Sequence, residues 1–139
     1  MVGFATYFTG EAFAALSGYT ILARTLDAGA RYHGGGFARG VARAKQSGGL
    51  LHHLFGLRAS ALFDELQDDE AASYLSGLLI GHEVAAALED GVAPPVLLIG
   101  SADLAPAYAA VLDAFGVPHR QADPDAAAHG LWRVGAHLS

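Results

Sequence analysis

The chain has no cysteine and few charged side chains. Without cysteine it can form neither a disulfide bond nor a thiolate site, which fits the reducing cytoplasm. Charged residues make up 16% of the sequence, below the usual share, whereas hydrophobic residues make up 53%, above it. The net charge of −6 argues against a general binder of nucleic-acid phosphates. The composition therefore predicts a cytoplasmic protein with no nucleic-acid partner.

Long hydrophobic runs are also lacking. The apolar runs at 78–80 and 96–99 are too short to cross a bilayer. The first residues include no basic segment, and Glu11 interrupts their apolar run, so they do not resemble a secretory signal. A chain of 139 residues is expected to form a single domain, residues 1–139, without a membrane partner.

The segment 71–116 organises the rest of the chain. Leu75, Leu78 and Leu79 recur at helical spacing with Ala86, which predicts a long helix with one buried face. A second row holds only small residues at four-residue spacing: Ser73, Gly77, Gly81 and Ala85. Because glycine costs about 1 kcal/mol relative to alanine inside a helix, this row predicts that another backbone approaches closely.

A strand and a turn follow this helix. Asp90 and Gly91 end the helix, and the apolar run at 96–99 predicts a strand buried on both faces, as in a parallel sheet. Gly100 and Ser101 follow at its carboxyl end, where open α/β sheets bind ligands. This turn, 99–103, is the one place where the residues alone indicate a site, and a second helix is expected after it.

The first 36 residues predict a strand, a helix and a connection. Phe4, Thr6 and Phe8 alternate with smaller or more polar residues, as in a strand. Thr9 suits the N-cap of the next helix, and Glu11 lies where the helix dipole favours an anion. Residues 27–36 are expected to be a flexible connection. A phosphate loop is the disfavoured alternative, because no lysine-serine or lysine-threonine pair follows the glycines.

Two amphipathic helices are expected next. Phe37, Val41 and Ala44 share a face of the first, and its basic residues Arg39 and Arg43 are interpreted as a solvated surface. The apolar face of the second is expected to hold Leu51, Leu54, Phe55 and Leu62. Arg58 lies on that same face. It is either an arginine whose stem packs at the edge of the core or a ligand for an anion.

The remainder completes an α/β order whose first half is unusually helical. Residues 117–122 predict a short edge strand, and the segment 123–125 has the sequence of a helix start. The face of the closing helix is expected to contain Leu131, Val134 and Leu138.

Catalytic motifs are few. The seven histidines include no HExxH motif, and no GxSxG motif is present, so no metal site is predicted. His82 and Glu83 point about 100° apart on a helix and make a poor acid–base pair. From residues alone we expect an α/β domain that binds a nucleotide or phosphate at 99–103 and has no catalytic residues of its own.

Four blocks together resemble the 2-keto-3-deoxygalactonate kinases, also called 2-dehydro-3-deoxygalactonokinases. They read FATYFTGEAFAALSGYTILARTL, LFGLRASAL, ASYLSGLLIGHEVAAAL and VLLIGSADLAPAYAAVL. The resemblance implies a ribonuclease-H-like, actin-type ATPase lobe of the sugar kinase superfamily. It further implies ATP and Mg²⁺ as cofactors and a sugar acid as substrate. In such kinases the VLLIGSAD segment resembles the adenosine-binding element.

The resemblance also bears on the ligand-binding residues and on what this chain lacks. The residues assigned to cofactor binding are Gly100, Ser101, Thr9, Gly10, Glu11 and Arg58, and no catalytic or metal-binding residue is assigned. The Asp-x-Gly-Thr phosphate loop of the family's first lobe and its second phosphate loop have no counterpart in this sequence. We therefore expect an incomplete, C-terminal lobe that is inactive alone and that needs the missing N-terminal lobe or self-associates. The alternative is a non-catalytic binding or assembly module derived from such a lobe.

Overall fold

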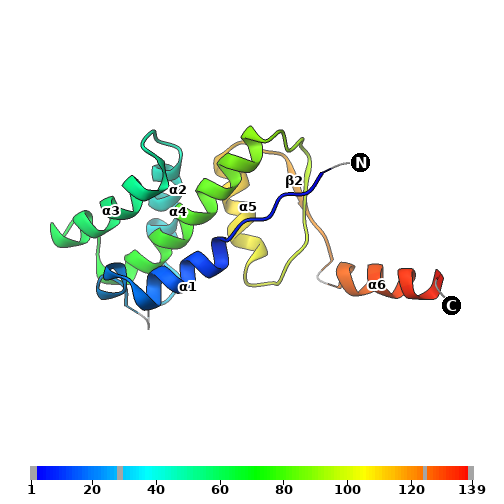
Figure 1. The fold of residues 1–139 in the computed structure, drawn as a ribbon, viewed down its shortest axis with the longest axis horizontal. Coiled ribbons are helices and arrows are strands. Elements are labelled where there is room, and N and C mark those ends of the chain that lie inside the picture. The colour runs from blue at the N-terminus through cyan, green and yellow to red at the C-terminus, as the bar shows by residue number, and fades with distance from the viewer. Residues whose placement is uncertain (1–2, 28–29, 124, 138–139) are drawn as a thin grey trace. The chain divides into compact units, whose positions relative to one another are not determined.

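The computed structural model describes residues 3–27, 30–123 and 125–137, which form two compact units, residues 1–91 and 92–139. The first unit contains α1 (Thr9–Tyr19), a 3₁₀ turn η1 (Ile21–Arg24), α2 (Gly34–Ala44), α3 (Gly49–Leu62) and α4 (Asp68–Glu89). The second contains β1 (Val96–Leu98), α5 (Ala105–Ala114), β2 (His119–Gln121) and α6 (Ala126–His137) (Figure 1). The described chain is thus a helix-rich α/β structure, as predicted.

Helix α4 is the centre of the first unit and contacts α1, α2 and α3. Leu75, Leu78 and Leu79 are buried as expected, and Leu57 from α3 and Leu22 from η1 join the same core. By length and composition α4 could also cross a membrane, but half of its apolar window is buried within this protein. Its apolar character is therefore explained by its place in the core.

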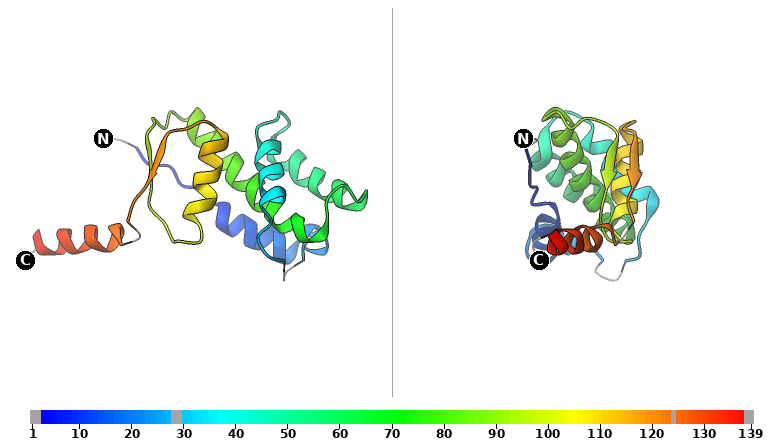
Figure 2. Two further views of the ribbon diagram at one scale, coloured as in Figure 1. Left: turned by 180° about the vertical axis from the view of Figure 1, so that it is seen from behind. Right: turned by 90° about the vertical axis from the view of Figure 1, so that its right-hand side faces the viewer.

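The predicted close approach at the small-residue row of α4 is confirmed. Its partner is α2, which crosses α4 in Figure 2. A Cβ built on Gly77 would lie 2.2 Å from the Phe37 carbonyl oxygen, and one on Gly81 would lie 2.6 Å from the Ala44 Cβ. The hydroxyl of Ser73 accepts a hydrogen bond from the His33 backbone at 2.9 Å.

The predicted N-terminal strand is wrong. Residues 3–8 have no regular structure, and the side chains of Phe4 and Phe8 are 95% and 72% exposed. An isolated strand is not stable without a hydrogen-bonding neighbour, and the described residues provide none here. The following helix has Phe8, not Thr9, at its N-cap, with no capping side-chain bond.

Two predictions about the connection and α3 also need correction. Residues 34–36, expected in a flexible connection, form the first turn of α2, because the His33 Nδ1 caps it by accepting from the Gly36 backbone at 3.0 Å. In α3 the buried face holds His53, Leu54 and Leu57. Three residues predicted to share that face are exposed instead: Leu51, Phe55 and Leu62.

The second unit is built on a two-stranded parallel sheet, with Val96 opposite His119 and Leu98 opposite Gln121. Figure 2 shows the strands side by side, and α5 packs against both. The parallel pairing confirms the prediction, but β1 is not buried on both faces, since Leu97 is 57% exposed. Two strands covered by one helix leave the other face uncovered.

Helix α6 also differs from expectation. It begins at Ala126, and Leu131 and Val134 are 75% and 59% exposed rather than buried; Leu138 lies outside the described residues. Asp123 does stabilise the chain before the helix, because its carboxylate accepts from the Asp125 backbone at 2.8 Å.

Candidate functional site

The turn after β1 presents open backbone at the carboxyl end of a parallel strand. Gly100 and Ser101 are both exposed. A Cβ built on Gly100 would meet no atom within 4 Å, so packing within the described chain does not require glycine there. Gly100 lies at the edge where α/β sheets hold ligands. Because it has no side chain, a bound molecule has room to approach the backbone there.

Ser101 also shapes the start of α5. Its backbone oxygen accepts from the Leu104 and Ala105 amides at 3.2 and 3.0 Å, and its Oγ accepts from the Leu104 amide at 3.3 Å. These bonds hold the turn against the first residues of the helix. The side chain therefore supports the turn and is small enough to leave room for a ligand beside it.

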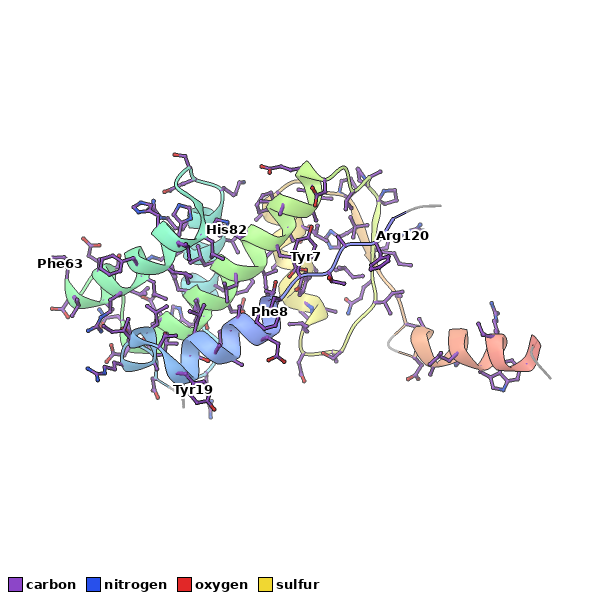
Figure 3. All side chains as sticks on the ribbon, in the orientation of Figure 1. Tyr7, Phe8, Tyr19, Phe63, His82 and Arg120 are labelled. Atoms are coloured by element: carbon purple, nitrogen blue, oxygen red, sulfur yellow. The ribbon has the colours of Figure 1, made fainter. Side chains whose placement is uncertain are left out.

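The other predicted ligand residues belong to the first unit. Thr9, Gly10 and Glu11 form the first turn of α1. Thr9 lines a shallow, mainly apolar cleft of about 240 Å³ whose other walls include Phe8, Leu79 and His82. Figure 3 labels Phe8 and His82, which come to this cleft from the N-terminal segment and α4. Glu11 and Gly10 are exposed beside it.

Arg58 is tied to the interior of the first unit. Its Nη1 donates to the Thr25 Oγ1 at 3.0 Å, and Thr25 is only 5% exposed. One guanidinium N–H group thus satisfies a buried hydroxyl, which matches the reading of Arg58 as an arginine at the core edge. The remaining N–H groups are the ones that an anion could use.

Sequence reasoning missed a histidine pair. The His53 Nδ1 lies 2.9 Å from the His82 Nε2, and the His53 Nε2 lies 3.1 Å from the Ser47 carbonyl oxygen. Because a carbonyl only accepts, His53 donates to Ser47, and with a neutral ring its Nδ1 accepts from His82. Burial lowers the pKa of His82, and the neighbouring His53 lowers it further. The signal in the sequence was its spacing: His53 comes four residues before Leu57, which places the two side chains on the same face of α3.

Arg39 and Arg43 were predicted to lie on a solvated face, and the Arg39 side chain is 47% exposed, but the pocket that both arginines line was not predicted. In the structure both line a pocket of about 360 Å³ together with Tyr74 of α4 and residues of α3. Their helical spacing gave no hint of this, because the opposite walls come from two other helices. Within the described residues, no group of three or more histidine or acidic side chains could hold a metal ion.

Comparisons with known proteins agree with one another. The model of the family described as 2-keto-3-deoxy-galactonokinase matches residues 1–134. The curated "Probable 2-dehydro-3-deoxygalactonokinase DgoK1" of Rhizobium meliloti (strain 1021) is 33% identical over 142 residues, covering 94% of this chain and 46% of the relative.

A solved structure is similar as well. The crystal structure of a "putative 2-dehydro-3-deoxygalactonokinase protein" from Sinorhizobium meliloti superposes with a TM-score of 0.78 at 33% identity. The similarity covers 88% of this chain and 42% of that one. The chain therefore spans less than half the length of the relatives it matches.

Proposed function

Because the chain belongs to the 2-keto-3-deoxy-galactonokinase family, we propose that residues 1–139 form the C-terminal, nucleotide-binding lobe of a sugar-acid kinase. The lobe would be of the ribonuclease-H-like, actin-type ATPase class. The complete cytoplasmic enzyme would transfer the γ-phosphate of ATP to 2-keto-3-deoxygalactonate, giving the 6-phosphate, in galactonate degradation.

The turn after β1 is the observation that carries this proposal. Gly100 has open space where a side chain would lie, and Ser101 is exposed next to it. Both fit an adenosine moiety, because the absence of a Cβ lets the purine or ribose approach the backbone and a small side chain does not block it. In this proposal Gly100 and Ser101 bind and orient the nucleotide, and ATP supplies the transferred phosphoryl group.

The phosphates of ATP and the magnesium ion need binding groups other than this turn. Magnesium is usually bound by one or two carboxylates together with substrate phosphates, and the described residues offer no cluster for it. Phosphoryl transfer depends on positioning and on neutralising charge around the phosphates. We propose that the missing N-terminal lobe provides those groups, since the chain covers 46% of its curated relative.

Titration of the chain with ATP and Mg²⁺, followed by backbone amide shifts, tests nucleotide binding. The proposal predicts shifts that cluster at Gly100 and Ser101, and shifts confined to other residues would contradict it. A second measurement tests the lobe assignment. The chain alone should not phosphorylate 2-keto-3-deoxygalactonate, and adding the N-terminal lobe as a separate polypeptide should restore turnover; activity of the isolated chain would refute this.

A non-catalytic binding or assembly module is the second candidate, favoured by exposed apolar side chains on α3 and at the residue directly after it. Leu51, Phe55, Leu62 and Phe63 are each more than 60% exposed. Such side chains are typical of a surface that another chain covers. If the chain self-associates and an added N-terminal lobe neither binds nor restores turnover, this candidate replaces the kinase lobe.

A further inference from the structure

A pocket of about 360 Å³, with several polar side chains in its walls, lies where α2, α3 and α4 meet, within the first unit. Arg39 and Arg43 of α2, with Gln46 just after that helix, line one side, Gly56 and Ser60 of α3 another, and Tyr74 of α4 a third. The volume is within the range of small-molecule sites, about 300–1,000 Å³. No lining residue is acidic, although the chain as a whole carries a net charge of −6.

The two arginines have different partners. Arg39 donates to the Glu70 carboxylate at 3.2 Å and to the Glu65 carbonyl oxygen at 2.8 Å, so its charge is balanced and its position fixed. Arg43 donates to the Gln46 amide oxygen and, at 3.2 Å, to the His52 Nε2. Neither of these acceptors carries a negative charge. Among the residues that the structure describes, no carboxylate pairs with Arg43.

Tyr74 adds a donor beside these charges. The residue is 9% exposed, and burial raises its pKa, while Arg43 and Arg39 act in the opposite direction. The phenol is therefore protonated at neutral pH and can donate. Because Gln46 accepts from Arg43 through its oxygen, its NH₂ group is also left to donate.

Gly56 keeps the pocket open. A Cβ built there would meet no atom within 4 Å, so packing within the described chain does not demand glycine. Glycine inside a helix nevertheless costs about 1 kcal/mol relative to alanine. Gly56 therefore lowers the stability of the helix, and it leaves this part of the pocket wall without a side chain.

We propose that this pocket binds the oxyanion of a small hydroxylated metabolite, either a carboxylate or a phosphate, with Arg43 as its charged partner and Tyr74 as a neutral donor. An arginine that has no counterion among the described residues and is flanked by further donors matches the acceptor oxygens of such an anion. The Ser60 hydroxyl donates to the Glu65 carboxylate at 3.3 Å and can still accept, so Ser60 and the Gln46 NH₂ group, which both line the pocket, can contact its hydroxyl groups. No residue of the turn at Gly100 lines this pocket, and the proposal does not depend on the kinase assignment.

Two probes test the proposal on the 139-residue chain: galactonate, a six-carbon polyhydroxy carboxylate, and inorganic phosphate. Binding is followed by calorimetry and by amide shifts, at fixed ionic strength because screening weakens exposed charges. We expect at least one probe to saturate, with shifts at α2 and at Tyr74. Saturation by galactonate alone indicates a carboxylate ligand, and saturation by phosphate alone indicates a phosphate ligand.

Matched variants make the result specific. Arg43→Gln should weaken binding about tenfold or more, as expected for loss of a hydrogen bond to a charged group. Gly56→Leu should weaken it by filling the pocket, and Arg120→Gln, on the exposed strand β2 (Figure 3), should leave it unchanged. The proposal is overturned if neither probe saturates, if Arg43→Gln binds as tightly as the parent chain, or if Arg120→Gln weakens binding equally. Circular dichroism checks that each variant is folded.

Discussion

Gly40 of α2 lies directly against the backbone of Tyr74 of α4. A Cβ built on Gly40 would lie 2.1 Å from the Tyr74 carbonyl oxygen, closer than any real side chain comes. The same contact recurs one turn earlier, where Gly36 faces the Glu70 carbonyl at 2.6 Å, and it is reciprocal, because Gly77 of α4 faces the Phe37 carbonyl of α2 at 2.2 Å. The two helices therefore touch through their backbones, and each provides glycines for the other.

Gly40→Ala should destabilise the first unit. The added methyl meets rigid backbone, so the helices must separate, and overpacking of this kind costs about 1–3 kcal/mol or more. Urea unfolding followed by circular dichroism measures the change. The matched control is Gly56→Ala, where the methyl meets open space and the gain in helix propensity should stabilise the chain by about 0.5–1 kcal/mol. Equal effects of the two substitutions would contradict the close crossing.

The His53–His82 pair should make stability depend on pH. Burial holds the pKa of His82 below its ordinary value of 6.5, so the unfolded chain binds more protons than the folded one below that pH. Stability is then fully present above pH 6.5, falls as the pH drops below it, and levels off beneath the folded pKa. His82→Gln should flatten the dependence of the unfolding free energy between about pH 7.5 and 5.5. His129→Gln, exposed on α6, should leave the slope unchanged, and an unchanged slope in His82→Gln would count against the pair.

The two readings of Arg58 can be separated. Arg58→Met leaves the buried Thr25 hydroxyl without its 3.0 Å partner, which should cost about 1–3 kcal/mol of stability. Thr25→Val removes the same bond but keeps the guanidinium. If Arg58 is only structural, both variants lose stability and retain nucleotide affinity in the ATP titration. A loss of affinity confined to Arg58→Met would instead make it an anion ligand.

Ser101→Trp should abolish nucleotide binding while leaving the fold intact, because the indole would occupy the space beside Gly100. Ser101→Ala is the control for the hydrogen bond to the Leu104 amide, whose loss should cost about 1 kcal/mol and leave binding largely unchanged. Calorimetric titration with ATP compares the two. Unchanged affinity in a folded tryptophan variant would remove Ser101 from the site.

The sequence was most informative where a steric requirement can be recognised from a few neighbouring residues. Gly77 and Gly81 predicted a close backbone neighbour because a glycine in a helix needs a reason, although the identity of the neighbour, α2, could not be deduced. The strand and helix around Gly100 followed from an apolar run, a turn and a second amphipathic segment. The prediction of parallel pairing was correct, because short apolar strands that are linked by a helix favour it.

The sequence was least informative where a helix has apolar residues on all of its faces. In α3, Leu51 and Phe55 have the same helical spacing as the buried residues, so periodicity could not distinguish the core face from the exposed one. The arginine pocket could not be predicted from the sequence either, because its walls come from three helices that are separated in the chain. Residues that meet only after packing leave no local pattern.

The backbone contact between α2 and α4 has a consequence for ligand capture. Such a contact contains no rotatable side chains, so the spacing between Arg43, one turn beyond Gly40 on α2, and Tyr74 on α4 is preorganised before any anion arrives. A ligand would then lose little affinity to ordering its own site. Amide hydrogen exchange should show the same rigidity, with the two helices opening together as one cooperative unit rather than separately.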